Sequence, residues 1–160
     1  MKYLTLMRHG DAEEMDGLKD FQRALTDLGI MEVSLVSKSL LADGICFDSV
    51  LSSSAVRAQQ TTSVVASALQ LEDSRILYHD DFYLAHPKKI LAAVEGLDNS
   101  AEHILIVGHN PGLPLCAEIL RGERESILPT AGCIGLALHI DEWKDLTPAC
   151  ASVRFRKYPE

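Results

Sequence analysis

Short, almost wholly apolar runs recur along the chain, and most of them stop abruptly at polar residues. Runs of this length are typical of strands, and a run without polar positions predicts a strand covered on both faces, as in a parallel sheet. The last two runs alternate between apolar and polar residues, which favours an antiparallel pair that closes the sheet. The expected strands comprise residues 2–8, 47–51, 75–78, 103–107, 133–140 and 151–156.

Segments with helical spacing of apolar residues separate the first five of these strands. The first expected helix follows Thr26, a suitable N-cap, and runs to about residue 42. The last has Asn110 as expected N-cap and Pro111 as its first residue, and it runs through about residue 120. The two others are expected over residues 55–71 and 87–95. The apolar stripe of the first helix is expected to contain Ile30, Val33, Val36 and Leu40, widened by Leu35 and Leu41.

The order β-α-β-α-β-α-β-α-β-β predicts the α/β class, in the form of a three-layer α/β/α sandwich with a mainly parallel central sheet. A chain of 160 residues is long enough for one domain and too short for two comfortable ones, so we expect a single domain over residues 1–160. Residues 10–24 are polar and acidic, and we expect them to form a loop with a short helical turn over the end of the first strand.

Charge and cysteine content limit the possible functions. The formal net charge of −8 disfavours a general nucleic-acid binder, although a few focused arginines can still form an anion pocket. Neither a secretory signal nor a run of membrane-span length is present, which predicts a cytoplasmic protein without a membrane anchor. We therefore expect reduced, mostly buried thiols without a zinc site for Cys46, Cys116, Cys133 and Cys150.

Unusual polar residues follow three of the expected strands. They are Arg8–Gly10, then Ser52–Ser54 with Arg57 close behind, and finally Gly108–Asn110. The carboxyl ends of parallel strands lie at one edge of the sheet, where open α/β sheets bind their ligands. Two arginines and two histidines from distant parts of the chain are therefore expected to converge on one pocket.

Such a pocket suits a phosphoryl group, whose transfer needs positive charge around its equatorial oxygens. Arg8 and Arg57 can each donate hydrogen bonds as a fork. A neutral His9 can attack phosphorus and form a covalent intermediate, and the nearby guanidinium groups disfavour its protonation. His109 can donate to a phosphoryl oxygen as charge develops, and Gly10 lets the backbone approach the ligand closely.

Two interpretations stay open for the residues beside these four. The serines at 52–54 either only cap the following helix or also leave backbone N–H groups of Ser52 and its neighbours free to bind an anion. Arg23 either reaches the pocket or forms a surface ion pair. Arg57 falls in the first turn of its helix, where a cation opposes the helix dipole, and this placement suggests an anion nearby.

Four segments together resemble the motifs of one family. Leu6–Gly10 resembles an R-H-G signature, and Arg23–Gly29 resembles an R-x-L-T-x-x-G segment that follows it. Leu51–Thr61 resembles S-x-x-x-R-A-x-Q-T, and Val107–Pro111 resembles a second-histidine motif. They occur in the order found in the histidine phosphatase superfamily, also called phosphoglycerate mutase-like, and span most of the chain.

The short length and the segment Arg8–Ala12 are most similar to the small SixA-type phosphohistidine phosphatases of this superfamily. The resemblance implies the small form of the phosphoglycerate mutase-like fold, without a cap insertion, and a hydrolase that needs no metal or other cofactor. It implies that His9 is the phosphorylated nucleophile, completed by Arg8, Arg57 and His109. The implied partner is a phosphohistidine-bearing protein or a small phosphorylated substrate.

The chain departs from the larger family members, which carry a glutamate general acid on a capping insertion. The corresponding segment, Tyr78–Pro87, has no glutamate and no room for a cap. An alkoxide leaving group needs a proton, whereas imidazole leaving a phosphoramidate needs less help. This favours phosphohistidine on a protein, although Asp11, Asp80 and Asp81 remain candidate acids. The alternatives are a small-molecule phosphomonoesterase of the same superfamily and a non-catalytic phosphate-binding module.

Overall fold

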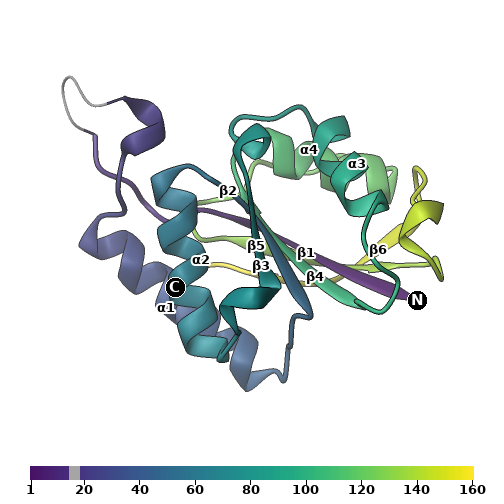
Figure 1. Ribbon diagram of the computed structural model, residues 1–160, viewed down its shortest axis with the longest axis horizontal. Coiled ribbons are helices and arrows are strands. Elements are labelled where there is room, and N and C mark those ends of the chain that lie inside the picture. Colours follow the sequence, from purple (N-terminus) through teal and green to yellow (C-terminus); the bar gives the residue numbers. More distant parts are fainter. Residues whose placement is uncertain (15–18) are drawn as a thin grey trace.

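The computed structural model describes residues 1–14 and 19–160, and it has the expected alternation of strands and helices (Figure 1). The strands are β1 (Lys2–Arg8), β2 (Ser49–Ser53), β3 (Ile76–His79), β4 (His103–Gly108), β5 (Cys133–Leu138) and β6 (Ala151–Lys157). The helices are α1 (Asp27–Ala42), α2 (Val56–Leu69), α3 (Pro87–Glu95) and α4 (Gly112–Arg121). The 3-10 turns are η1 (Asp20–Gln22), η2 (Asp73–Arg75), η3 (Asp80–Phe82) and η4 (Trp143–Asp145). No helix in the two described ranges is long and apolar enough to cross a membrane.

The six strands form one sheet in the order β3-β2-β4-β1-β5-β6. The pairs β3-β2, β2-β4 and β4-β1 are parallel, and β1-β5 is antiparallel. The pair β5-β6 is antiparallel as well, as the alternating pattern predicted. Helices α1 and α2 cover one face of the sheet and α3 and α4 cover the other (Figure 1). The predicted three-layer α/β/α sandwich is therefore confirmed.

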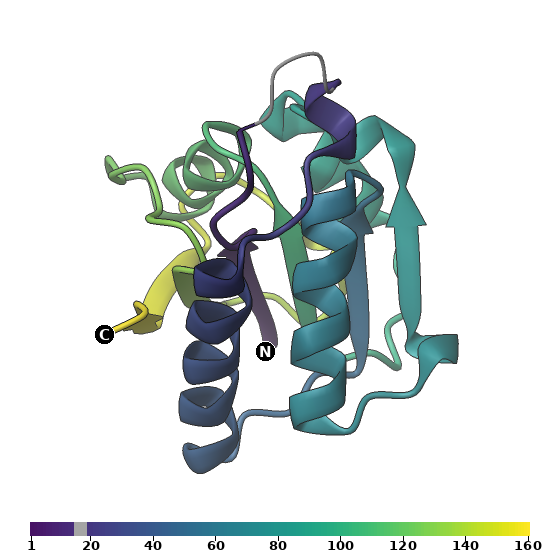
Figure 2. The same cartoon turned by 90° about the vertical axis from the view of Figure 1, so that its left-hand side faces the viewer.

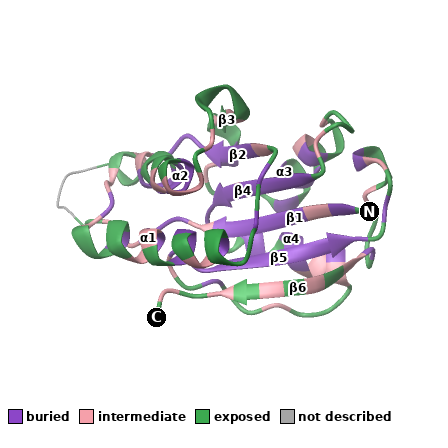
Figure 3. Ribbon diagram, turned by 90° about the horizontal axis from the view of Figure 1, so that it is seen from below, coloured by how far each residue is buried: buried purple, intermediate pink, exposed green. Residues whose placement is uncertain are grey.

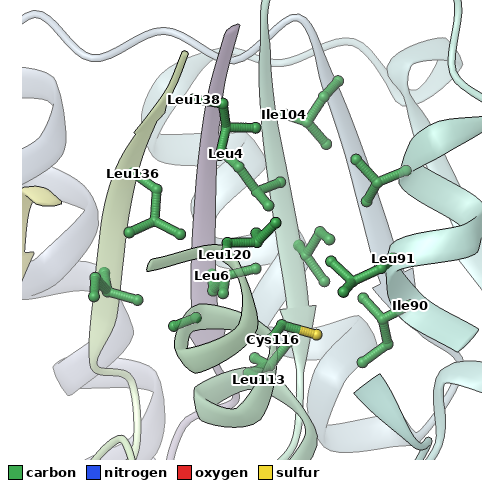
Figure 4. Packing of buried hydrophobic residues seen from close by; sticks show 14 of the residues in the cluster. Leu4, Leu6, Ile90, Leu91, Ile104, Leu113, Cys116, Leu120, Leu136 and Leu138 are labelled. Atoms are coloured by element: carbon green, nitrogen blue, oxygen red, sulfur yellow. The ribbon is translucent and has the colours of Figure 1, made fainter. Parts of the chain in front are cut away.

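Burial follows the sheet order. The central strands β4 and β5 are buried throughout, whereas β6 at the edge alternates between half-buried and exposed residues (Figure 3). The side chains of Leu4 and Leu6 on β1 pack with Leu113 and Leu120 of α4 on one face (Figure 4). Met7 belongs to the core on the opposite face, under α1 and α2. Each such side chain stabilises the fold by roughly 1.5–3 kcal/mol, which holds the carboxyl end of β1 in place.

Several element boundaries differ from the predictions by one or two residues, and two of these differences have a clear physical cause. Strand β2 lies two residues later than predicted, because its pairing with β4 runs from Ser49 to Ser52, and Phe47 is buried before the strand begins. Asn110 is not the N-cap of α4, which begins at Gly112. Its side-chain amide instead donates to the carbonyl of Leu128 at 2.8 Å and accepts from the N–H of the same residue at 3.3 Å. Asn110 therefore ties two loops together.

The predicted apolar stripe of α1 is too wide. Val33, Val36 and Leu40 are buried as expected, together with the small residues Gly29 and Ser37. A Cβ atom at Gly29 would lie 2.2 Å from the carbonyl oxygen of Asp11, so a larger residue there would push the helix away from the loop that follows β1. Because the backbone of α1 lies this close to its neighbour, only a narrow face of the helix is buried. The flanking side chains that the prediction placed inside are exposed, namely Ile30, Leu35 and Leu41.

Candidate active site

The three polar strand ends do meet. A cavity of about 390 Å³ opens where β1, β2 and β4 reach their carboxyl ends. Figure 2 shows η1 beside the N-terminal end of α2 at this end of the sheet. The loop expected over residues 10–24 contains this short turn. Residues 15–18 of that loop, Asp16 among them, lie outside the described ranges. The cavity is lined by Arg8, His9, Asp20, Arg23, Arg57, Tyr83, Leu84, His109 and Asn110.

The His9 ring is held in one tautomer. Its Nδ1 lies 2.7 Å from the carbonyl oxygen of Gly10, and a carbonyl only accepts, so the proton is on Nδ1. The lone pair is therefore on Nε2, which accepts a hydrogen bond from Nε of Arg57 at 3.2 Å. Burial, aided by the charges of Arg57 and Arg8, lowers the pKa of His9 to about 4. At neutral pH the ring is uncharged, with Nε2 available as a nucleophile.

Gly10 and Ser52 lie beside the cavity rather than in its wall. The N–H of Gly10 donates to Oγ1 of Thr61 at 3.0 Å, which fixes the carbonyl that orients His9. Ser52 is fully buried, and its hydroxyl is hydrogen-bonded to Thr62 and to the carbonyl of Ser53. The predicted serine cap is wrong, because Ala55 is the N-cap residue of α2 and makes no side-chain hydrogen bond.

His109 faces His9 across the cavity, with the two ring centroids 5.1 Å apart. Its Nε2 lies 2.8 Å from Oγ of Ser53, the neighbour of the serine that the sequence suggested. Successive residues of a strand point to opposite faces, which is why Ser53 reaches His109 and Ser52 does not. Burial lowers the pKa of His109 to about 3, with further lowering by His9 and Arg57.

Arg8 and Arg57 both present their guanidinium groups to the cavity. Nη1 of Arg8 donates to the carbonyl of Leu128 at 3.1 Å, in the loop that Asn110 also holds. Burial, with the charges of Arg57 and Arg23, lowers the pKa of Arg8 from its usual value. Arg23 reaches the cavity and also pairs with Asp20 at 3.2 Å, so both interpretations offered for it hold together.

None of the three candidate acids lines the cavity. Oδ2 of Asp11 accepts from the hydroxyl of Thr26 at 2.8 Å, and Asp80 and Asp81 are exposed on η3. The carboxylate in the cavity wall is instead that of Asp20, which the sequence reasoning did not single out. One signal did point to it, since the placement of Arg57 in the first turn of α2 suggested a nearby anion.

Tyr83 was also missed. It lies in the segment Tyr78–Pro87, where the sequence pointed only to the two aspartates. Its hydroxyl donates to Oδ2 of Asp20, and its ring packs against Phe21 and His109. Within the described part of the chain, no cluster of three or more His, Cys, Asp or Glu side chains is arranged to hold a metal ion.

The fold and this cavity define an α/β protein of the phosphoglycerate mutase-like class, and comparison with known proteins agrees. The model of the histidine phosphatase superfamily (branch 1) matches residues 4–81. An uncharacterised protein of Mycobacterium tuberculosis is 30% identical over 157 residues, which cover 92% of this chain and 96% of that protein. The chain belongs to the histidine phosphatase superfamily.

Within the superfamily, the chain is similar to small phosphohistidine phosphatases. The phosphohistidine phosphatase SixA of Escherichia coli is 29% identical over 135 residues, which cover 83% of each chain. A solved structure from Agrobacterium tumefaciens, assigned as a phosphohistidine phosphatase SixA, is 25% identical. It superposes with a TM-score of 0.84 over 99% of this chain and 98% of that one. Neither similarity assigns roles to individual residues.

Three buried histidines predict that the protein loses stability in mild acid. The folded-state pKa is lowered by burial to about 4 in His9, about 4 in His103 and about 3 in His109, against an ordinary value of 6.5. Below about pH 6.5 the unfolded chain binds these protons and the folded chain does not, so the stability present above that pH decreases on acidification. For each histidine, the free energy of unfolding should decrease by on the order of 1 kcal/mol per pH unit as the pH falls from about 6 to the folded-state pKa.

Urea titrations at about pH 7.5 and about pH 5 measure this loss as a change in the free energy of unfolding. The matched variant is His103→Gln, which removes one of the three groups, away from the cavity. In this variant the change in the free energy of unfolding between the two pH values should be smaller by about a third. Equal stability of the wild-type protein at the two pH values would contradict the prediction.

Proposed function

We propose that the protein is a phosphatase that works through a covalent phosphohistidine on His9 and acts on phosphohistidine carried by another protein. The observation that carries the proposal is the neutral His9 ring, whose Nε2 lone pair faces a cavity lined by Arg8, Arg57 and His109. A nucleophile beside fixed cations is the arrangement that phosphoryl transfer requires, because charge develops on the three equatorial oxygens.

Buried polar atoms without a partner support an oxyanion as the ligand. Among the described residues, four buried side-chain nitrogens make no hydrogen bond. His79 Nε2 lies away from the cavity, and the other three, Arg8 Nε, Arg23 Nε and His109 Nδ1, belong to residues that line it. Buried polar atoms are nearly always satisfied, so three unpaired ones on residues of one cavity wall suggest a ligand rich in acceptor oxygens. A phosphoryl group supplies such oxygens and the negative charge that Arg8 and Arg23 favour.

The reaction takes two steps. In the first, Nε of Arg57 gives up its hydrogen bond to Nε2 of His9, and the freed lone pair forms a bond to phosphorus. The bond to the leaving group breaks at the same time, and its electron pair stays with the leaving nitrogen. In the second, water attacks the phosphorus and the P–Nε2 electron pair returns to His9, which becomes neutral again. The second proton of the water moves to a phosphoryl oxygen, and inorganic phosphate leaves as H2PO4⁻. Arg8 and Arg57 stabilise the charge on the phosphoryl oxygens in both steps. His109 donates to a phosphoryl oxygen when its proton is on Nδ1.

The groups around the cavity favour a phosphoramidate over an ester. An ester oxygen leaves as an alkoxide unless an acid protonates it. The carboxylate in the cavity wall is a poor acid, because the hydroxyl of Tyr83 and the charge of Arg57 hold the pKa of Asp20 below its usual value in the empty site. A carboxyl group with an ordinary pKa would also be ionised at neutral pH. A phosphohistidine ring that is protonated on its far nitrogen leaves as neutral imidazole and needs no acid. No step requires a metal ion.

A comparison of three substrates tests the proposal. We expect turnover of a phosphohistidine-bearing protein to exceed that of a phosphoserine peptide or a sugar phosphate by about 10²-fold, the contribution that a general acid makes to ester cleavage. A strong chelator should leave the rate unchanged. Faster turnover of the sugar phosphate would favour the small-molecule phosphomonoesterase, and binding without turnover would favour the non-catalytic module.

A further inference from the structure

The carboxylate of Asp20 occupies the donors that a phosphoryl group would need. Its Oδ2 accepts from Nη2 of Arg57 at 3.0 Å, and its Oδ1 pairs with Nη1 of Arg23 at 3.2 Å. The backbone carbonyl of Asp20 accepts from Nη1 of Arg57 at 2.7 Å. The hydroxyl of Tyr83 donates to Oδ2 as well. An internal anion thus binds two of the three arginines in the cavity wall.

The two partners of this ion pair differ in exposure. The Arg57 side chain is 4% exposed and is held next to Nε2 of His9, whereas the Asp20 side chain is 46% exposed. The buried Arg57 side chain cannot move away from the cavity, whereas the carboxylate of Asp20 can move outward into solvent. A phosphoryl group at Nε2 of His9 would lie beside the same guanidinium group. A carboxylate and a phosphoryl group of like charge cannot both sit close to it without repulsion.

We propose that Asp20 is the internal counter-ion of the empty phosphate site, and that the phosphoryl group displaces its carboxylate from Arg57 and Arg23 on binding. This inference rests on the proposed function, because it assumes that phosphate binds in this cavity. Asp20 keeps a buried guanidinium group paired between turnovers, when a lone charge there would be costly. It also weakens the binding of inorganic phosphate, the product, and so assists its release.

A role for Asp20 in merely positioning Arg57 predicts a different outcome. If the carboxylate only held the guanidinium group in place, its removal would loosen Arg57 and weaken phosphate binding. If it competes with phosphate, its removal strengthens phosphate binding. The direction of the change in affinity therefore separates the two roles.

Calorimetric titration with inorganic phosphate measures that direction in Asp20→Asn. We expect this variant to bind phosphate about tenfold more tightly than the wild-type protein, and to be inhibited by phosphate at correspondingly lower concentration. Asp20→Glu, which keeps the charge, should bind like the wild type. The matched control is Asp141→Asn, which makes the same change in net charge at a side chain 98% exposed beside the N-terminus, at the opposite end of β1.

Equal or weaker binding by Asp20→Asn would overturn the inference while leaving the proposed function standing. If neither the wild-type protein nor Asp20→Asn binds phosphate, the inference and the proposed function are both overturned. A second measurement needs no variant and follows the Asp20 carboxyl carbon by nuclear magnetic resonance during acid titration. Phosphate should raise the pKa of Asp20, because the carboxylate loses its pairing with Arg57 and Arg23. An unchanged pKa in saturating phosphate would count against displacement.

Discussion

Replacing His9 with alanine is expected to abolish turnover of phosphohistidine, with a loss of at least about 10⁴-fold in kcat. The reason is chemical, because Nε2 of His9 is the atom that bonds to phosphorus in the proposed reaction. The same variant should form no phosphoenzyme, whereas the wild-type protein, mixed briefly with substrate and quenched, should carry acid-labile, base-stable phosphate. Single-turnover assays and phosphate analysis of the quenched protein measure the two effects.

A matched control separates this loss from a general effect of removing a histidine. His139 is exposed and contacts the hydroxyl of Ser152 at 3.2 Å, away from the cavity. His139→Ala should keep the wild-type rate. If His9→Ala retained its activity, or if the wild-type phosphoenzyme carried its phosphate on another residue, the assignment of the nucleophile would be wrong.

Replacing Arg57 with alanine is expected to lower kcat/KM by about 10²- to 10³-fold, the typical cost of losing a fixed donor that stabilises transition-state charge. The loss should also change the pH dependence. The charge of Arg57 lowers the pKa of His9, so removing it raises that pKa from about 4 and moves the acidic fall in activity to higher pH. Steady-state kinetics between about pH 4 and about pH 8 measure both effects.

Two further variants sharpen this prediction. Arg57→Lys keeps the charge but loses the planar fork, and we expect it to recover the pH profile more completely than the rate. Arg75→Ala removes an exposed arginine from η2, outside the cavity. It should leave the rate and the pH profile unchanged. A full rate in Arg57→Ala would mean that Arg57 does not stabilise the transition-state charge.

Much of the fold could be predicted because its signals are local. Buried strands of a parallel sheet are apolar at most positions. Thr26 caps α1 through its own hydroxyl, which accepts from the N–H of Gly29 at 3.0 Å. The errors occurred where a distant contact overrides a local preference. Asn110 has the chemistry of an N-cap, but its amide is taken by Leu128, eighteen residues away. Strand β2 is shifted because its partner β4 sets the register.

The sequence by itself determined that four residues would meet, and Arg8, His9, Arg57 and His109 do line one cavity. Arg8 ends a predicted parallel strand and the other three follow one, and such ends must lie at one edge of the sheet. Only the tertiary structure decided what surrounds them. Asp20 and Tyr83 are 63 residues apart and meet through loops that have no periodic pattern, so nothing local predicts their contact. The strand pleat likewise decided that Ser53, rather than Ser52, reaches His109.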